Sequence, residues 1–184
     1  NTVSKTASHF ECLTELKLDG ISIELIYRGG KFVQAITRGD GKIGEDVTHS
    51  IKNAKGFPKS ISVTTEVSVR CEALLLIEDW KKYLSENANP RNAVSGLVRR
   101  TDGKNSQHIC CIAFDVLTDK KFVTEEDRIK WLKSENFFVT WSKVSKPDQV
   151  EALVKELENR RAALKYEIDG AVVKLNQIAD QEAL

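Results

Sequence analysis

The sequence predicts a mixed α+β fold built from antiparallel sheets. Apolar and polar residues alternate over 21–27, which is the period of a strand. Gly29-Gly30 then favours a tight turn, and 32–37 follows as the returning strand of a hairpin. Strand patterns dominate the first half of the chain, and helical patterns are interspersed later. Because strands and helices do not alternate regularly, antiparallel sheets are favoured over a parallel βαβ arrangement.

Three further strands are predicted from apolar runs and from alternation. They cover residues 67–77, 109–117 and 171–175, and the second of them is expected to be buried. Glu72 interrupts the first of these strands, and a carboxylate in an apolar strand needs a partner. An ordinary structural ion pair would meet that need as well as a ligand would.

Helices are predicted where apolar residues recur at spacings of three and four. A short helix is expected around residues 80–84. A second helix begins after Thr124, which resembles the first residue of a capping box with Asp127. Pro147 precedes a third helix, whose apolar face contains residues 150, 153, 154 and 157.

The composition is that of an ordinary globular protein. The chain has 184 residues, of which 41% are apolar and 30% are charged. No apolar run approaches the length of a membrane span, and residues 1–10 lack the pattern of a signal peptide. The formal net charge is +1, so nucleic-acid binding has to come from local basic clusters. The four cysteines have no Cys-x-x-Cys spacing and are expected to be reduced thiols in or near the core.

Lys17 is the first candidate for chemistry. It lies in the segment ELKLDG of residues 15–20, directly before the first predicted strand. A lysine is a nucleophile only when its amine is deprotonated, which cationic neighbours or the exclusion of water favour. An adjacent carboxylate such as Asp19 can orient the amine, and Gly20 allows the backbone to approach a nucleotide. Alone, this short pattern also fits a charged surface turn, which is its commoner meaning.

Other segments carry residues of matching chemistry. Residues 37–46 form a glycine-rich loop in which Arg38 can clamp a phosphate or a sugar, although an ordinary β-turn has the same composition. Arg91 and Arg99 belong to a basic stretch that suits phosphate contacts or, alternatively, a solvated face. Lys174 lies on the opposite face of its strand from the apolar residues, where it can meet a phosphate or extend to solvent.

Arg161 continues the apolar face of the helix that follows Pro147. It comes four residues after Leu157, so its side chain is expected to point inward. An inward arginine needs an anion, which is either a protein carboxylate or a bound phosphate.

Taken together, these segments resemble those of the NAD-dependent DNA ligase family in order and in spacing. Family members carry ELKLDG, TRGDG-x-x-GED, V-R-G-E, NPRN-A-x-x-G-x-x-R and EIDG-V-V-x-K. The corresponding segments of this chain are residues 15–20, 37–46, 69–72, 89–99 and 167–174. The resemblance covers nearly the whole chain from about Glu11 onward. It implies the nucleotidyltransferase fold, which is similar to ATP-grasp folds and has antiparallel sheets with flanking helices.

The resemblance implies a role for each matching residue. Lys17 attacks the α-phosphate of NAD and forms lysyl-AMP, with release of nicotinamide mononucleotide. Asp19 and Lys174 assist at the catalytic centre. The nucleotide is bound by Glu15, Leu16, Lys17, Arg38, Glu72, Arg161 and Lys174.

The resemblance also implies partners and a second cofactor. AMP passes to the 5′-phosphate of nicked double-stranded DNA, which Arg91 and Arg99 contact, and the nick is sealed. Glu72 and Asp169 are the residues implied to place a magnesium ion. The expected protein is a monomer without membrane association that acts in DNA replication and repair, in the cytoplasm of a bacterium or encoded by a virus.

The match implies that residues 1–184 form one adenylation domain. The family's N-terminal nicotinamide-binding domain and its C-terminal oligomer-binding-fold, zinc, helix-hairpin-helix and BRCT regions lie outside the match. We therefore expect a fragment of a larger ligase, or an unusually reduced relative, that is weakly active or inactive with NAD by itself. ATP-dependent ligases, RNA ligases and capping enzymes share K-x-D-G, but segments 37–46 and 89–92 favour the NAD family. A DNA-binding or scaffold module without activity is the non-enzyme alternative.

The sequence departs from the family pattern at a few positions. Cys71 replaces the usual glycine and adds a side chain next to Glu72. Val94 and Ser95 occupy positions where alanine is commoner. The first of these departures puts the environment of Glu72 in question.

Overall fold

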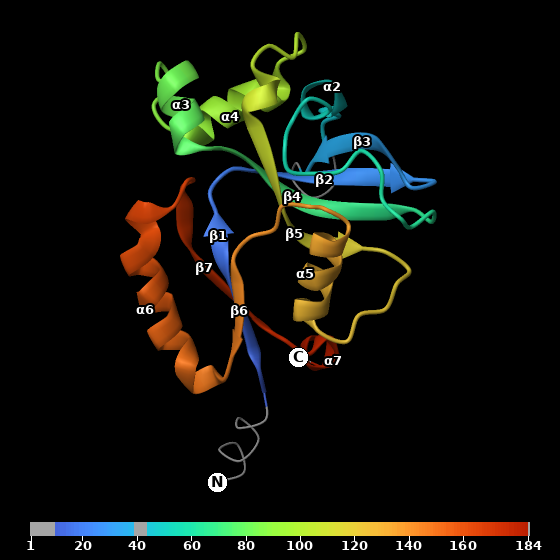
Figure 1. Ribbon diagram of the computed structural model, residues 1–184, viewed down its shortest axis with the longest axis vertical. Coiled ribbons are helices and arrows are strands. Elements are labelled where there is room, and N and C mark those ends of the chain that lie inside the picture. The colour runs from blue at the N-terminus through green and yellow to red at the C-terminus, as the bar shows by residue number, and fades with distance from the viewer. Residues whose placement is uncertain (1–9, 39–43, 184) are drawn as a thin grey trace.

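The computed structural model describes residues 10–38 and 44–183 and contains two antiparallel sheets (Figure 1). The smaller sheet has the strand order β6-β1-β7, and the larger sheet has the order β3-β2-β4-β5. The predicted α+β fold with antiparallel sheets is therefore confirmed. The strands are β1 (Cys12–Leu18), β2 (Ile21–Arg28), β3 (Lys31–Thr37), β4 (Val67–Leu75), β5 (Ile109–Leu117), β6 (Ser142–Ser145) and β7 (Ile168–Leu175).

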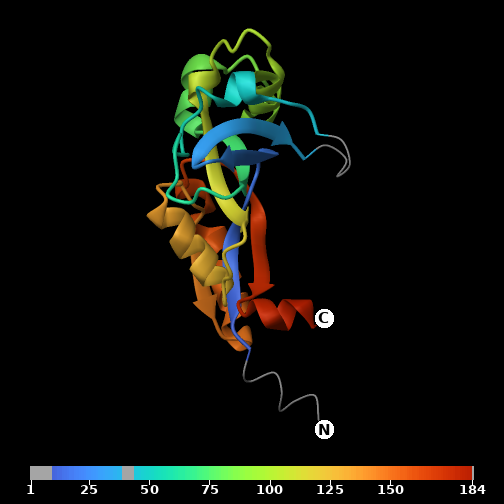
Figure 2. The ribbon, with the colours of Figure 1, turned by 90° about the vertical axis from the view of Figure 1, so that its right-hand side faces the viewer.

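Helices pack against both sheets. α4 contacts β4, α5 contacts β5, and α6 contacts β1 and β7 of the smaller sheet. Figure 2 shows the larger sheet with α2 and α4 above the smaller sheet, in which β1 runs beside β7. The helices are α2 (Thr48–Ile51), α3 (Ile77–Tyr83), α4 (Pro90–Arg99), α5 (Glu125–Ser134), α6 (Val150–Arg160) and α7 (Ile178–Glu182), with 3₁₀ turns η2 (Ser106–His108), η3 (Pro147–Gln149) and η4 (Arg161–Ala163).

The local signals of the sequence produce the expected elements. Arg28 pairs with Lys31 across the Gly29-Gly30 turn, whose two residues have φ of 58° and 73°. Positive φ at both central positions matches the twist of a two-residue hairpin, and glycine adopts it without strain. The capping box at Thr124 is also present, since its side chain accepts from the backbone N–H of Asp127 at 3.0 Å.

The expectation that residues 15–20 precede the first strand is wrong. Residues Cys12–Leu18 form β1, the central strand of the smaller sheet. Its neighbour β7 lies about 150 residues later in the sequence, with Leu16 opposite Ala171. Charged residues alternate with apolar ones at the end of β1, but the partner strands are too distant in sequence for local patterns to reveal them.

All four cysteines are buried and free, as predicted. Cys71 is fully buried and belongs to the main hydrophobic core. Glu72, the next residue of β4, lines a cavity on the opposite side of the sheet. Cys71, which replaces the family's glycine, therefore adds its volume to the core, on the side of β4 away from the cavity.

Gly20 lies where the link between β1 and β2 passes β4. A Cβ at this position would lie 2.3 Å from the Ala73 carbonyl oxygen. We expect Gly20→Ala to lower the free energy of unfolding by about 2 kcal/mol, because the β4 backbone would have to move. Urea unfolding measures this loss.

Gly96 provides the matched control for that substitution. It lies inside α4, and a Cβ there would meet nothing within 4 Å. Gly96→Ala is expected to raise the free energy of unfolding by about 0.5–1 kcal/mol through helix propensity. Equal stability of the two variants would contradict the close approach at Gly20.

Candidate active site

A cavity of about 540 Å³ lies where the two sheets meet. It brings together all the site residues inferred from the sequence except Arg99 and Arg161. The residues that line the cavity come from β1, β2, β4, β5, β7, the start of α4 and the links after β1 and β3, so distant parts of the sequence contribute to one site. The cavity is lined by Glu15, Leu16, Lys17, Leu18, Asp19, Gly20, Ser22, Arg38, Arg70, Glu72, Arg91, Phe114, Asp115, Asp169, Val172 and Lys174.

Lys17 lies at the open side of this cavity. Its Nζ donates to Asp169 Oδ2 at 2.5 Å, and the two side chains are 51% and 61% exposed. Pairing of β1 with β7 places the two residues together, although they are 152 positions apart. The hydrogen bond from Lys17 holds the pKa of the Asp169 carboxyl below its usual range.

Glu15 and Lys174 form the closed end of the cavity. Lys174 Nζ lies 2.8 Å from Glu15 Oε2, and the Glu15 side chain is 4% exposed. Burial raises the pKa of Glu15, although the Lys174 ammonium opposes the shift. The other oxygen, Glu15 Oε1, is buried and has no hydrogen-bond partner among the described residues. A buried acceptor without a partner is costly, and a hydrogen bond from a donor on a ligand would remove that cost.

Glu72 faces the cavity from β4. Its Oε1 accepts from the backbone N–H of Gly20 at 3.1 Å. Burial raises the pKa of Glu72 to about 7, despite that hydrogen bond and the positive charge of Arg91. The Glu72 carboxyl is therefore close to half-protonated near neutral pH.

The arginines of α4 extend the site outward. Arg91 Nη1 donates to Asp19 Oδ1 at 3.0 Å, on a helix whose first turn is capped by the side chain of Asn89. Arg99 lines a second cavity of about 600 Å³ that shares Arg38, Glu72 and Arg91 with the first. Arg99 Nε donates to Glu45 at 3.2 Å. The second cavity, which we call the outer groove, is lined by the three arginines Arg38, Arg91 and Arg99 and by two glutamates.

The expectation that Arg161 points inward is wrong. α6 ends at Arg160, and the chain continues from Arg161 as the 3₁₀ turn η4. This change of helical period rotates Arg161 away from the apolar face of α6, and its side chain is exposed. Its remaining link to the site is electrostatic, because it adds to the effect of Lys17 in lowering the pKa of Asp169.

Several cavity residues were not singled out from the sequence. Phe114 and Asp115 belong to β5, Val172 lies on β7, and Arg70 lies on β4. Asp115 was detectable, since a carboxylate within the apolar run of β5 needs a partner. Phe114 carries no such signal, because an aromatic residue in a strand is ordinary core sequence.

The carboxylates of the site do not form a preassembled metal centre. Within residues 10–38 and 44–183, no group of three or more histidine, cysteine, aspartate or glutamate side chains could hold an ion. Magnesium is commonly bound by one or two protein carboxylates together with substrate phosphates and water. Glu72 and Asp169, which both line the cavity, fit that type of shared site.

Comparison with known proteins decides the family. A family model described as the NAD-dependent DNA ligase adenylation domain matches residues 1–184. The chain belongs to this family. The resemblance inferred from the five sequence segments is therefore confirmed.

Curated relatives of this adenylation domain are DNA ligases from bacteria. The chain is 38% identical to a DNA ligase of Sorangium cellulosum over 91% of the chain, and 34% identical to one of Treponema denticola over 94%. It spans 25% and 30% of the length of these two relatives.

Solved structures share the fold of the adenylation domain. A structure named "Pmar-Lig_Pre." aligns with a TM-score of 0.58 and 16% identity over 96% of the chain and 42% of its own length. A structure of "mycobacterial DNA ligase D complexed with ATP and MES" aligns with a TM-score of 0.51 and 15% identity over 93% of the chain and 51% of its own length. The nucleotidyltransferase fold expected from the resemblance is thus confirmed. Among the described residues, no helix has the length and apolar character needed to cross a membrane.

Proposed function

We propose that the chain is the adenylation core of an NAD-dependent DNA ligase and that Lys17 is its nucleophile. The observation that carries the proposal is the meeting of Lys17, Lys174 and the free Oε1 of Glu15 in one cavity. The cavity thus offers an amine, a cation and an unpaired acceptor to a nucleotide. Lysyl-AMP formation uses an amine as the nucleophile and a cation to offset phosphate charge, and the acceptor can bind the adenine amine.

The closed end of the cavity suits an adenine ring. Glu15 Oε1 lacks a partner and accepts hydrogen bonds, so it fits the exocyclic amine of adenine. Phe114 and Val172 add apolar surface to the cavity wall against which a planar ring can pack. Leu16 lies alongside in β1, as the family resemblance implies. Glu15 therefore serves as a selector for adenine.

The open side of the cavity suits the α-phosphate and the ribose. Lys17 Nζ forms the bond to phosphorus, while the bond from phosphorus to the bridging oxygen breaks and nicotinamide mononucleotide leaves with the electron pair. The amine proton passes through the contact with Asp169 to water, since the lowered pKa of Asp169 prevents that carboxylate from retaining it. Arg38 and, from the closed end of the cavity, Lys174 neutralise charge on the phosphate oxygens, and Asp19 positions Arg91.

Magnesium is the second cofactor of the proposed reaction. Glu72 and Asp169 would hold it together with the phosphates of the nucleotide. When bound, the ion supplies positive charge that offsets the charge of the phosphate oxygens.

The outer groove suits the DNA of the second step. Arg91 and Arg99 line it, and arginine binds phosphate oxygens in a bidentate manner. In our proposal the 5′-phosphate of a nick approaches lysyl-AMP along this groove, receives AMP, and the nick is sealed. The partners are therefore NAD and nicked double-stranded DNA, and the protein acts as a monomer in the bacterial cytoplasm.

The choice between NAD and ATP is tested by label transfer. The native polypeptide that contains this chain is incubated with NAD or ATP labelled in the adenylate group, and the modified lysine is located by mass spectrometry. We expect one AMP per chain from NAD and none from ATP. AMP transfer from ATP alone would replace the proposal with an ATP-dependent ligase, and affinity for nicked DNA without any adduct would favour a binding module.

A further inference from the structure

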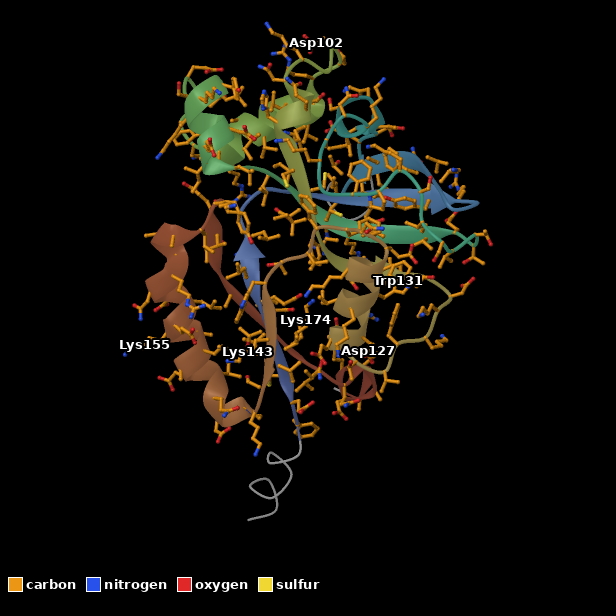
Figure 3. All side chains as sticks on the ribbon, in the orientation of Figure 1. Asp102, Asp127, Trp131, Lys143, Lys155 and Lys174 are labelled. Carbon is orange, nitrogen blue, oxygen red and sulfur yellow. The ribbon has the colours of Figure 1, made fainter. Side chains whose placement is uncertain are left out.

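Lys174 belongs to a series of ion pairs that extends well beyond the cavity. From Glu15 it continues through Lys174, Glu125 on α5, Arg128 and Asp115 to Arg70 and Glu24. The charges alternate in sign along the whole series. Figure 3 shows Lys174 between the smaller sheet and α5, which is the helix that carries Glu125.

Two buried carboxylates of this series lie next to Lys174. Glu15 is the nearer one, and Glu125 is the second. Its side chain is 3% exposed, and its Oε2 lies 3.9 Å from Lys174 Nζ. Its other oxygen, Oε1, accepts from Arg128 Nη1 at 2.9 Å and from Gln181 Nε2 at 3.1 Å. The two oxygens therefore have different partners: Oε1 accepts from Arg128 and Gln181, and Oε2 faces Lys174.

The backbone fixes Glu125 relative to the strand that carries Lys174. The N–H of Glu125 donates to the carbonyl of Asn176 at 2.8 Å, two residues after Lys174. Gln181 Nε2 also donates to the Leu175 carbonyl at 2.6 Å. α5, α7 and the end of β7 therefore form one hydrogen-bonded unit, which keeps the Glu125 carboxyl beside the strand that carries Lys174.

We propose that Glu125 is a positioning residue for Lys174 in adenylate transfer. The inference rests on the proposed function, in which Glu15 shares its charge with the adenine amine. When that happens, Lys174 needs a second buried carboxylate to hold its ammonium at the closed end of the cavity. Glu125 Oε2 supplies it from outside the residues that line the cavity.

The test is Glu125→Gln in the native polypeptide. The amide keeps an acceptor oxygen for Arg128 and Gln181 but turns a donor NH₂ toward the Lys174 ammonium. We expect the single-turnover rate constant of lysyl-AMP formation at saturating NAD to fall about tenfold, with the half-saturating NAD concentration changed by less than about twofold. Thermal unfolding of each variant reports whether it folds.

Glu126→Gln is the matched control. Glu126 is the neighbouring first-turn carboxylate of α5, but its side chain pairs with Lys130 on the surface. This variant loses the same charge at the helix N-terminus and should adenylate at the wild-type rate. In a Lys174→Ala background, Glu125→Gln should cause no further loss, because it acts through Lys174.

The outcomes separate this inference from the proposed function. A wild-type protein that forms no lysyl-AMP overturns the proposed function itself. A folded Glu125→Gln protein that adenylates as fast as Glu126→Gln overturns only the role of Glu125. If Glu125→Gln does not fold, Glu125→Asp replaces it. That variant keeps the charge but withdraws it from Lys174 by one methylene, so an intermediate rate supports the role and a wild-type rate overturns it.

Discussion

Lys17→Ala is expected to abolish the AMP adduct, with a loss of at least about a thousandfold in lysyl-AMP formation from NAD. The other lysine lining the cavity, Lys174, forms an ion pair with Glu15 at the closed end and cannot replace the nucleophile. Folding should be almost unaffected, because the Lys17–Asp169 pair is more than half exposed and such pairs contribute little stability. Intact-mass measurement after incubation with NAD checks the first result, and thermal unfolding checks the second.

Lys143→Ala is the control for the nucleophile. Lys143 is an exposed lysine on β6, the other strand that pairs with β1, and it lies outside the cavity (Figure 3). This variant should acquire one AMP per chain at the wild-type rate. An adduct on the Lys17→Ala protein at any appreciable rate would assign the nucleophile to another residue.

Lys174→Ala is expected to lower the rate of lysyl-AMP formation and to remove a large part of the stability. The substitution leaves Glu15 and Glu125, which are 4% and 3% exposed, without the cation between them. Removing one partner of a buried ion pair costs about 3 kcal/mol or more, because the remaining charge stays buried. Urea unfolding at pH 8 measures this cost.

The loss of stability in Lys174→Ala should depend on pH in a defined direction. Burial already raises the pKa of Glu15 above its ordinary value of 4.5, and Lys174 opposes that shift. Without Lys174 the folded carboxyl binds its proton still more tightly than the unfolded one does. The deficit is therefore greatest at pH 8 and shrinks as the pH falls toward 4.5, where protonation removes the buried charge.

Lys130→Ala is the control for this prediction. Lys130 pairs with Glu126 one turn earlier on the surface of α5. Its loss should change the free energy of unfolding by less than about 0.5 kcal/mol at either pH. A deficit of Lys174→Ala that stays constant from pH 8 to pH 5 would contradict the assignment of the cost to buried carboxylates.

The sequence by itself determined the family and most of the local structure. Gly29-Gly30 forms a turn with positive φ, which glycine adopts without strain, and Thr124 with Asp127 caps the first turn of a helix within four residues. Both signals act over a few residues, so they could be interpreted without knowledge of the fold. The five motifs likewise predicted residues such as Lys17, Glu72 and Lys174 that the structure brings to one cavity.

Only the tertiary structure decided how those residues are paired. Asp169 meets Lys17 across 152 positions because β1 and β7 are neighbours, and no local pattern encodes that pairing. The inward direction expected for Arg161 was wrong, since the period of α6 changes at that residue. Glu125, which resembles an ordinary acidic residue of a helix's first turn, becomes a buried partner of Lys174 when α5 docks on the end of β7. Spacing and composition report which side chains are present, whereas burial and long-range contacts decide their charge and orientation.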